Sequence, residues 1–271
     1  MPEILINIAV TGAAGRMGKA IVAAVQTNPH TALSGALEVS GSPALGMDAG
    51  EAAGIGRTGV KITDDRDRAF KKAAVIVDFS TPEASMMTLE EAVHLKKALV
   101  IGTTGFSHHQ RERIKELSGS ARVVMSPNMS VGVNLLLKLV HDAAKAIGSE
   151  YDIEIIECHH RHKKDAPSGT AVRIAEVIAA AVDRDLEKVA VYARKGIIGE
   201  RRPEEIGIQS IRAGDVVGDH TVIFGAPGER IELTHKASSR ETFAQGAVKA
   251  AIWIADRESG IYDMQDVLGL K

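Results

Sequence analysis

The chain has 271 residues, of which 45% are hydrophobic and 25% are charged, and its formal net charge at pH 7 is −2. This composition is ordinary for a globular protein of one or two domains, and the near-neutral charge gives no electrostatic basis for nucleic-acid binding. A single cysteine excludes an internal disulfide, and no apolar run reaches the roughly 18 residues that span a bilayer. No secretory signal is visible, so we expect a cytoplasmic protein without a membrane partner.

The first predicted element is a buried parallel strand, Ile4-Leu-Ile-Asn-Ile-Ala-Val10. It is followed by the turn Thr11-Gly-Ala-Ala-Gly-Arg-Met-Gly18 and by a helical stretch over residues 19–25. The order strand, glycine turn, helix is the one that a dinucleotide-phosphate site requires. Ala14 stands where the usual pattern has its second glycine, so a tight turn without a ligand is the alternative interpretation.

The second predicted strand, residues 31–37, ends at Glu38. A carboxylate at this position can accept hydrogen bonds from the ribose hydroxyls of adenosine. Val39 follows it, rather than a cation that would pair with a 2′-phosphate, so we expect NADH to be preferred over NADPH. Arg16 or a loop lysine could offset this preference, and Glu38 could instead be a solvated loop carboxylate.

Three more strands are predicted over residues 73–79, 98–101 and 122–125, and each is followed by a short loop of small or polar residues. In an open parallel sheet, the carboxyl ends of the strands line the ligand crevice. We therefore expect that side chains directly after these strands contact the nicotinamide half of a cofactor, although any of them could be an ordinary turn residue. The candidates are Thr103, Thr104 and Asn128.

The pattern changes after Met129, where longer strands follow one another. Successive strands with few helices are typical of an α+β domain with a mixed sheet. We therefore predict an α/β protein with a Rossmann-like dinucleotide-binding domain and a central α+β domain, and we expect the last helix to return to the first domain. The elements predicted after Met129 are helices over 131–147, 170–182 and 240–256 and strands over 151–158, 188–194, 206–213, 217–225 and 229–237.

The densest cluster of reactive side chains lies between the strand 151–158 and the helix 170–182. Its sequence is Glu157-Cys-His-His-Arg-His-Lys-Lys-Asp-Ala-Pro-Ser-Gly-Thr170. The free N–H groups at the start of a helix bind anions, and Gly169 lets a ligand approach the backbone closely. Ser168-Gly-Thr170 therefore indicates a carboxylate site, although a simple helix N-cap is the alternative.

The same cluster contains proton donors. His159 and His160 titrate near neutral pH, and Lys163 and Lys164 add positive charge. These residues predict a site for a small, doubly anionic substrate that must accept a proton. A solvated loop and a metal site are the alternatives; adjacent histidines diverge on an extended backbone and the usual zinc motifs are absent, so we expect no metal. Cys158 is expected to pack at the strand end.

These residues resemble those of a known family, bacterial 4-hydroxy-tetrahydrodipicolinate reductase (dihydrodipicolinate reductase). The segment His159–Thr170 is very similar to the signature of that family, and the similarity extends over almost the whole chain. The supporting segments are Gly12–Gly18, Val77–Phe79, Gly102–Phe106, Asn128–Asn134, Arg212–Gly214 and Thr234–Arg240.

The resemblance implies a role for each matching position. His159 and Lys163 match positions assigned to proton transfer, and the matching substrate contacts are His160, Ser168, Gly169 and Thr170. The cofactor contacts that it implies are Gly12, Ala13, Ala14, Gly15, Arg16, Met17, Glu38, Gly102, Thr103, Thr104, Ser126, Pro127, Asn128 and Met129.

The resemblance also implies an architecture and a reaction. Residues 1–129 and 240–271 would form the dinucleotide-binding domain, and residues 130–239 a substrate-binding domain that assembles a homotetramer. The reaction, in lysine and diaminopimelate biosynthesis, delivers a hydride from NADH or NADPH to ring C4 of a cyclic imine dicarboxylate, with loss of water. Some members carry arginine at the positions of Val39 and Thr81, which again favours NADH here.

Two other functions remain open from the sequence. One is an amino-acid dehydrogenase of the same two-domain plan, acting on aspartate or homoserine. The other is a non-catalytic sensor that binds NADH and reports on it. The histidine and lysine cluster over 159–170 argues against both, because neither function needs proton donors beside an anion site.

Overall fold

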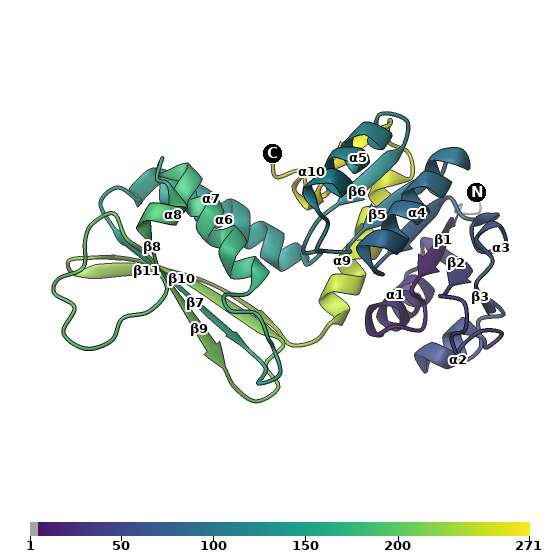
Figure 1. Cartoon of the computed structure of the whole chain (residues 1–271), viewed down its shortest axis with the longest axis horizontal. Coiled ribbons are helices and arrows are strands. Elements are labelled where there is room, and N and C mark those ends of the chain that lie inside the picture. Colours follow the sequence, from purple (N-terminus) through teal and green to yellow (C-terminus); the bar gives the residue numbers. More distant parts are fainter. Residues whose placement is uncertain (1–4) are drawn as a thin grey trace. The chain divides into compact units, whose positions relative to one another are not determined.

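The structure is a computed structural model and describes residues 5–271, so Ile4, where the first strand is predicted to begin, lies outside the described residues. The chain divides into two compact units. The first consists of the chain up to Val131 together with Arg240–Lys271, and the second is Gly132–Ser239. Figure 1 labels the helices and strands of both units.

The first unit is built on a seven-stranded sheet whose strands are all parallel, in the order β12-β6-β5-β4-β1-β2-β3. The strand order reverses between β1 and β4, and in such sheets ligands bind at the carboxyl ends of the strands at this point. The strands are β1 (Ile6–Thr11), β2 (Thr31–Leu37), β3 (Ile62–Thr63), β4 (Val75–Asp78), β5 (Ala98–Ile101), β6 (Arg122–Met125) and β12 (Gly260–Tyr262).

Helices cover both faces of this sheet, which is why its strands read as continuous apolar runs. Alternate residues of a strand point to opposite faces, so Ile8 and Val10 pack against α1, α2, α9 and α10, whereas Ala9 packs with α3, α4 and α5. The helices are α1 (Arg16–Thr27), α2 (Ala49–Ala53), α3 (Arg66–Phe70), α4 (Pro82–His94), α5 (His108–Ser118), α9 (Glu241–Ile254) and α10 (Met264–Leu268).

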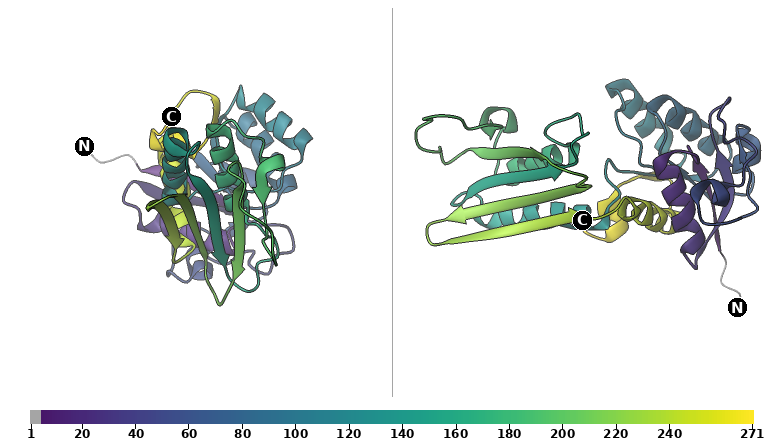
Figure 2. Two further views of the ribbon diagram at one scale, coloured as in Figure 1. Left: turned by 90° about the vertical axis from the view of Figure 1, so that its left-hand side faces the viewer. Right: turned by 90° about the horizontal axis from the view of Figure 1, so that it is seen from below.

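The second unit contains a mixed five-stranded sheet in the order β11-β10-β7-β9-β8. Helices α6 and α7 lie along one face of it (Figure 1), and the right-hand view of Figure 2 looks onto the opposite face. The elements are β7 (Asp152–His159), β8 (Ala190–Val191), β9 (Ile206–Arg212), β10 (Gly218–Ala226), β11 (Glu229–Ala237), α6 (Val131–Ile147), α7 (Gly169–Ala181) and α8 (Leu186–Val189).

The predicted fold class is confirmed: a parallel Rossmann-like sheet and a second, mixed sheet are both present. The strand predicted over 188–194 is wrong. Asp185 accepts a hydrogen bond from the backbone N–H of Glu187 and caps the short helix α8, so only Ala190–Val191 pairs as a strand. The chain also continues beyond the last predicted helix into β12 and α10.

No helix within residues 5–271 is long and apolar enough to cross a membrane.

Candidate functional site

The turn between β1 and α1 ends at a helix N-terminus, while the N–H groups of Ala13, Ala14 and Gly15 in the turn are hydrogen-bonded within the protein. Gly12 has φ +63°, a conformation that side chains rarely adopt, and a Cβ on Gly18 would lie 2.0 Å from the Gly12 carbonyl oxygen. Both positions therefore require glycine, the first for the turn and the second for the close approach of α1. Gly15 is the N-cap of α1 and offers no capping side chain, so the N–H groups of the first turn can bind a phosphate.

Glu38 at the end of β2 is tied to this turn. Its Oε2 accepts a hydrogen bond from the backbone N–H of Ala14 at 3.0 Å, and its Oε1 accepts one from the N–H of Val39 at 2.9 Å. The carboxylate is thus held next to the glycine turn, in the place predicted for a ribose contact.

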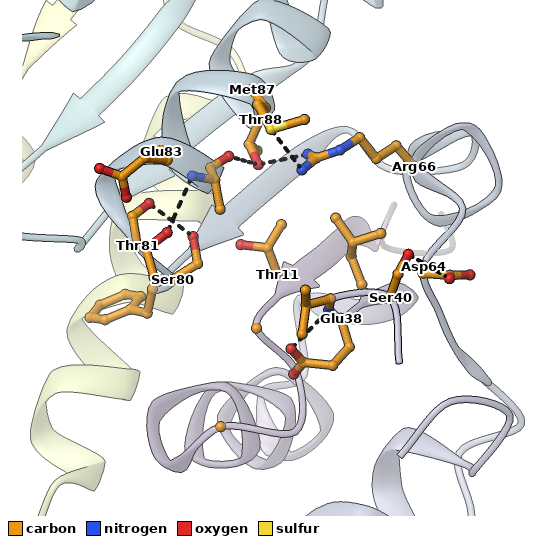
Figure 3. A pocket seen from close by; sticks show the side chains of 16 residues that line it. Thr11, Glu38, Ser40, Asp64, Arg66, Ser80, Thr81, Glu83, Met87 and Thr88 are labelled. Carbon is orange, nitrogen blue, oxygen red and sulfur yellow. Dashed lines mark hydrogen bonds between the residues drawn. The ribbon is translucent and has the colours of Figure 1, made fainter. Parts of the chain in front are cut away.

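A cavity of about 730 Å³ opens where β1, β2 and β4 end (Figure 3). Among the predicted cofactor contacts, Gly12, Gly15 and Glu38 line it. The other lining residues are Thr11, Leu37, Val39, Ser40, Asp64, Arg66, Phe79, Ser80, Thr81, Glu83, Ala84, Met87 and Thr88.

Ser40, Asp64 and Arg66 are polar or charged lining residues that the sequence analysis did not single out. Ser40 Oγ donates to Asp64 Oδ2 at 2.8 Å, which places a second carboxylate close to the end of β2. The guanidinium of Arg66 donates to Thr88 Oγ1 at 3.2 Å and approaches Met87 Sδ at 3.9 Å, so it is held against α4 (Figure 3). Arg66 begins the short helix α3, Asp64 lies between β3 and α3, and Ser40 lies in the loop after β2.

Other predicted cofactor contacts lie in the loops after β1, β5 and β6. Ala13, Thr103, Ser126 and Met129 are buried, and Ser126 Oγ donates to the carbonyl of Asn128 at 2.8 Å. The remaining positions are at least partly open: Ala14, Met17, Gly102 and Asn128 are half-buried, and Arg16, Thr104 and Pro127 are exposed.

Asp78 joins the loops after β4 and β5, and the sequence analysis did not single it out. It is fully buried, and its Oδ1 accepts hydrogen bonds from Ser80 Oγ at 2.6 Å, Ser85 Oγ at 2.9 Å and Thr103 Oγ1 at 3.1 Å. Because Ser80 lines the cavity and Thr103 follows β5, this carboxylate fixes the rim of the cavity.

The second cluster of functional side chains lies in the second unit, at the end of the core-facing side of its sheet. Along β7 the residues that point toward the helices are Ile153, Ile155, Glu157 and His159, and all four are buried. The side of β7 that faces the helices is therefore apolar at its start and carries an acid and a histidine at its end. Strand pairing sets Arg212 of β9 beside His159 and His220 of β10 beside Glu157.

Glu157 is fully buried and paired. Arg212 donates to both of its carboxylate oxygens at 2.9 Å and 2.8 Å, and His159 Nδ1 lies 2.5 Å from Oε2. Burial alone would raise the pKa of Glu157, but hydrogen bonds from Arg212, Ser210 and His159 outweigh it and lower the pKa to about 2. The carboxylate is therefore ionised at neutral pH.

The surroundings of His159 disfavour its charged form. Burial is the largest cause that lowers the pKa of His159, and the charges of Lys163 and Arg212 act in the same direction, whereas Glu157 opposes them. The ring of His220 stands edge-on to it, with centroids 5.2 Å apart. Burial lowers the pKa of His220 itself to about 4.

The loop after β7 is turned rather than extended, which brings Lys163 back toward His159. The N–H of Lys163 donates to the carbonyl of His160 at 3.1 Å, and Lys163 Nζ pairs with Asp165 at 2.9 Å. His160 is half-buried, and its ring lies 6.3 Å from that of His162. Lys164 is exposed.

Ser168 is the N-cap of α7. Its Oγ accepts from the N–H of Ala171 at 3.2 Å and lies 3.1 Å from His220 Nε2, and its own N–H donates to Glu157 Oε1 at 3.2 Å. Ser168 is buried, so its hydroxyl is used within the protein. Gly169 is exposed and Thr170 is half-buried, so solvent reaches the first turn of α7 at these positions.

Within residues 5–271, no group of three or more histidine, cysteine or acidic side chains is placed to hold a metal ion. Cys158 is half-buried at the end of β7 and is a free thiol.

The two halves of the chain match two family models. Residues 6–129 match the N-terminal part of dihydrodipicolinate reductase, and residues 132–268 match its C-terminal part. The chain belongs to the dihydrodipicolinate reductase family. It is therefore an NAD(P)H-dependent oxidoreductase.

Individual relatives agree with this membership. A 4-hydroxy-tetrahydrodipicolinate reductase from Syntrophotalea carbinolica is 52% identical over 267 residues, which is 98% of this chain and 100% of the relative. A solved structure of dipicolinate-bound dihydrodipicolinate reductase from Paenisporosarcina sp. TG-14 is 23% identical with a TM-score of 0.75, over 97% of this chain and 99% of the other.

More distant structures share the fold alone. GenD2 from gentamicin A biosynthesis, solved in complex with NAD, is 10% identical with a TM-score of 0.60, over 98% of this chain and 91% of the other.

The residues of the first unit themselves fit a dinucleotide. This unit has an uncapped helix N-terminus behind a glycine turn for the phosphates, and a carboxylate at the end of β2 for the ribose.

Proposed function

We propose that this protein reduces 4-hydroxy-tetrahydrodipicolinate to tetrahydrodipicolinate in lysine and diaminopimelate biosynthesis, with NADH or NADPH as the hydride donor. The observation that carries the proposal is the buried His159, paired with Glu157, close to the start of α7 in a member of this reductase family. A dicarboxylate that must gain a proton fits this cluster, as argued from the sequence.

In the second unit, some residues bind the substrate and others transfer protons. The start of α7 at Gly169 and Thr170, with the positive end of the helix dipole, binds one substrate carboxylate, and His160 adds a second contact. His159 and Lys163 supply the protons. Ser168 contributes by capping α7 and holding its first turn in place.

The cofactor supplies a hydride when bound in the first unit, and the residues of this chain hold it. Gly12, Gly15 and the first turn of α1 bind the phosphates, and Glu38 binds the ribose hydroxyls of the adenosine half. The loops after β5 and β6 are proposed to hold the nicotinamide half, through Gly102, Thr103, Thr104 and residues 126–129.

We propose further that NADH is used better than NADPH. A 2′-phosphate would lie beside Val39 and near two carboxylates, those of Glu38 and Asp64. Arg66 is a cation in the same cavity, but its guanidinium is held against Thr88 and Met87 of α4. Like charges close to a phosphate disfavour its binding, which supports a preference for the cofactor without it.

A homotetramer in the cytoplasm is also part of the proposal. The face of the second sheet that turns away from α6 and α7 carries the half-buried Ile156 and Ile223 and the exposed Ile211. Apolar side chains on an uncovered sheet face are suited to burial against another subunit.

The test is oxidation of NADH by the purified protein, followed at the nicotinamide absorbance. Substrate is generated in the cuvette from pyruvate and aspartate semialdehyde by the preceding synthase, and NADPH is run in parallel. Synthase-dependent oxidation is expected, faster with NADH. Turnover of aspartate or homoserine instead would indicate a dehydrogenase, and NADH binding without any turnover would indicate a sensor.

A further inference from the structure

We propose that Glu157 is a positioning residue for the reaction: its carboxylate fixes the ring and the tautomer of His159, so that Nε2 is the nitrogen that exchanges protons with substrate. The inference rests on the proposed role of His159 and assigns a function to a side chain that does not itself touch substrate.

The tautomer follows from the partners of Glu157. Arg212 donates to both carboxylate oxygens, and an ionised carboxylate can only accept hydrogen bonds. The ring nitrogen 2.5 Å from Oε2 must therefore be the donor, so Nδ1 of His159 carries a proton. In the neutral ring Nε2 is then unprotonated, and any proton that His159 takes up and later donates must be carried at Nε2.

The sheet leaves room at that nitrogen. Gly218 of β10 lies next to His159, and a Cβ built on Gly218 would come within 2.9 Å of Nε2. Any larger residue there would crowd the reactive nitrogen, so the absence of a side chain at position 218 keeps this edge of the ring free.

The same carboxylate also holds the loop that follows. Glu157 Oε1 accepts the N–H of Ser168, the N-cap of α7, at 3.2 Å. Arg212, which is anchored by Glu157, donates to the carbonyl of Asp165 at 2.6 Å. One buried acid therefore places the proton donor, the start of the anion-binding helix and the segment that carries Lys163.

The charges around His159 make the effect of Glu157 measurable. Arg212 on β9 and Lys163 on the loop oppose a positive charge on His159, and Asp165 is paired to Lys163. The ring of His220 on β10 packs edge-on against it. Glu157 is the group in contact with the ring that favours this charge. Removing its charge makes His159 harder to protonate.

The experiment combines ring nitrogen NMR of His159 with the pH dependence of kcat. In the wild-type protein, neutral His159 is expected to carry its proton on Nδ1, which NMR reports without substrate. In Glu157→Gln, whose amide can accept from or donate to Nδ1, a mixture of both tautomers is expected. We also expect kcat to fall about 10-fold or more and its decline at high pH to begin at lower pH, because His159 loses its proton earlier.

Glu154→Gln is the matched control, because Glu154 is also an arginine-paired acid on β7 but does not contact His159. It should leave the tautomer and the pH profile unchanged. A wild-type ring protonated on Nε2, or a Glu157→Gln profile identical to that of the wild type, would overturn the proposal. If Glu157→Gln does not fold, the wild-type tautomer alone decides. Absence of the reductase reaction in the wild-type protein would instead reject the proposed function. The NMR result does not depend on turnover, so the two failures can be distinguished.

Discussion

At the scale of single residues, the proposed preference for NADH depends on the negative charge at the end of β2. Glu38 is fixed by two backbone N–H groups, and Asp64 is brought near it by Ser40. Asp64 is exposed, so water and salt screen its charge and its effect on a bound phosphate is modest.

Replacing Asp64 by Asn removes one negative charge from the rim of the cavity. We expect the Kd of NADPH to fall about fivefold and that of NADH to stay the same, because about 1 kcal/mol of repulsion acts on the 2′-phosphate alone. Fluorescence titration of the two cofactors at low salt measures both values.

Asp65→Asn is the control for this change. Asp65 is the neighbouring residue and carries the same charge, but it caps α3 and does not line the cavity, and Asn caps a helix equally well. Equal changes in NADPH affinity for the two variants, or an equal gain for NADH, would contradict the role given to Asp64.

At the scale of elements, the contact between α1 and the turn after β1 depends on the absence of a side chain at Gly18. A methyl group there would lie 2.0 Å from the Gly12 carbonyl, so Gly18→Ala must push the helix away from the sheet. We expect Tm to fall, with a loss of about 1–3 kcal/mol in stability, and both NADH and NADPH to bind more weakly. Calorimetry and the same titrations measure these effects.

Gly225→Ala provides the comparison, since a Cβ on Gly225 meets nothing within 4 Å and its backbone conformation is ordinary. It should leave cofactor binding unchanged. Normal NADH affinity in Gly18→Ala would show that the position of α1 does not matter for the phosphates.

The elements were predictable where a local signal exists. Apolar runs and glycine turns predict β1, β2, β4, β5 and β6. A parallel strand that is buried on both faces is a continuous apolar run, which can be read from the sequence without knowing its neighbouring strands. The short elements that shape the cavity were not assigned. Helix α3 has five residues and β3 has two, so neither is long enough to show a periodic pattern. Asp64 and Arg66 were missed for this reason, whereas Ser40 lies in the loop after β2, where no periodic pattern exists.

At the scale of the whole molecule, buried histidines make stability depend on pH. The pKa of His220 is about 4 in the folded protein against 6.5 for an unperturbed histidine, so the unfolded chain binds more protons between these values. Stability is therefore complete above pH 6.5 and is lost as the pH falls toward 4, by on the order of 3 kcal/mol from this residue. Glu157, with a pKa of about 2, adds a further loss below about pH 4.5.

We expect His220→Gln to flatten the decline in the free energy of unfolding between pH 6.5 and pH 4. Chemical denaturation at a series of pH values measures this slope. The exposed His109→Gln should leave the slope unchanged. An undiminished slope in His220→Gln would mean that other groups cause the acid sensitivity.

The candidate site was only partly predictable, because its parts are distant in the sequence. The composition of the segment 159–170 indicated His159, His160, Lys163 and Lys164, and the resemblance to the family implied the roles of His159 and Lys163. Arg212 and His220 reach Glu157 only through the pairing of β9 and β10 with β7, which the sequence does not specify. The partners of a buried acid could therefore be identified only from the register of the sheet.

The most direct test of this account is the turnover of His159→Gln in the coupled assay, compared with His162→Gln, an exposed histidine of the same loop. We expect kcat to fall roughly 100-fold or more in His159→Gln, with NADH affinity unchanged, and His162→Gln to retain nearly full activity. Wild-type turnover by a folded His159→Gln protein would contradict the assignment of His159 as the proton donor.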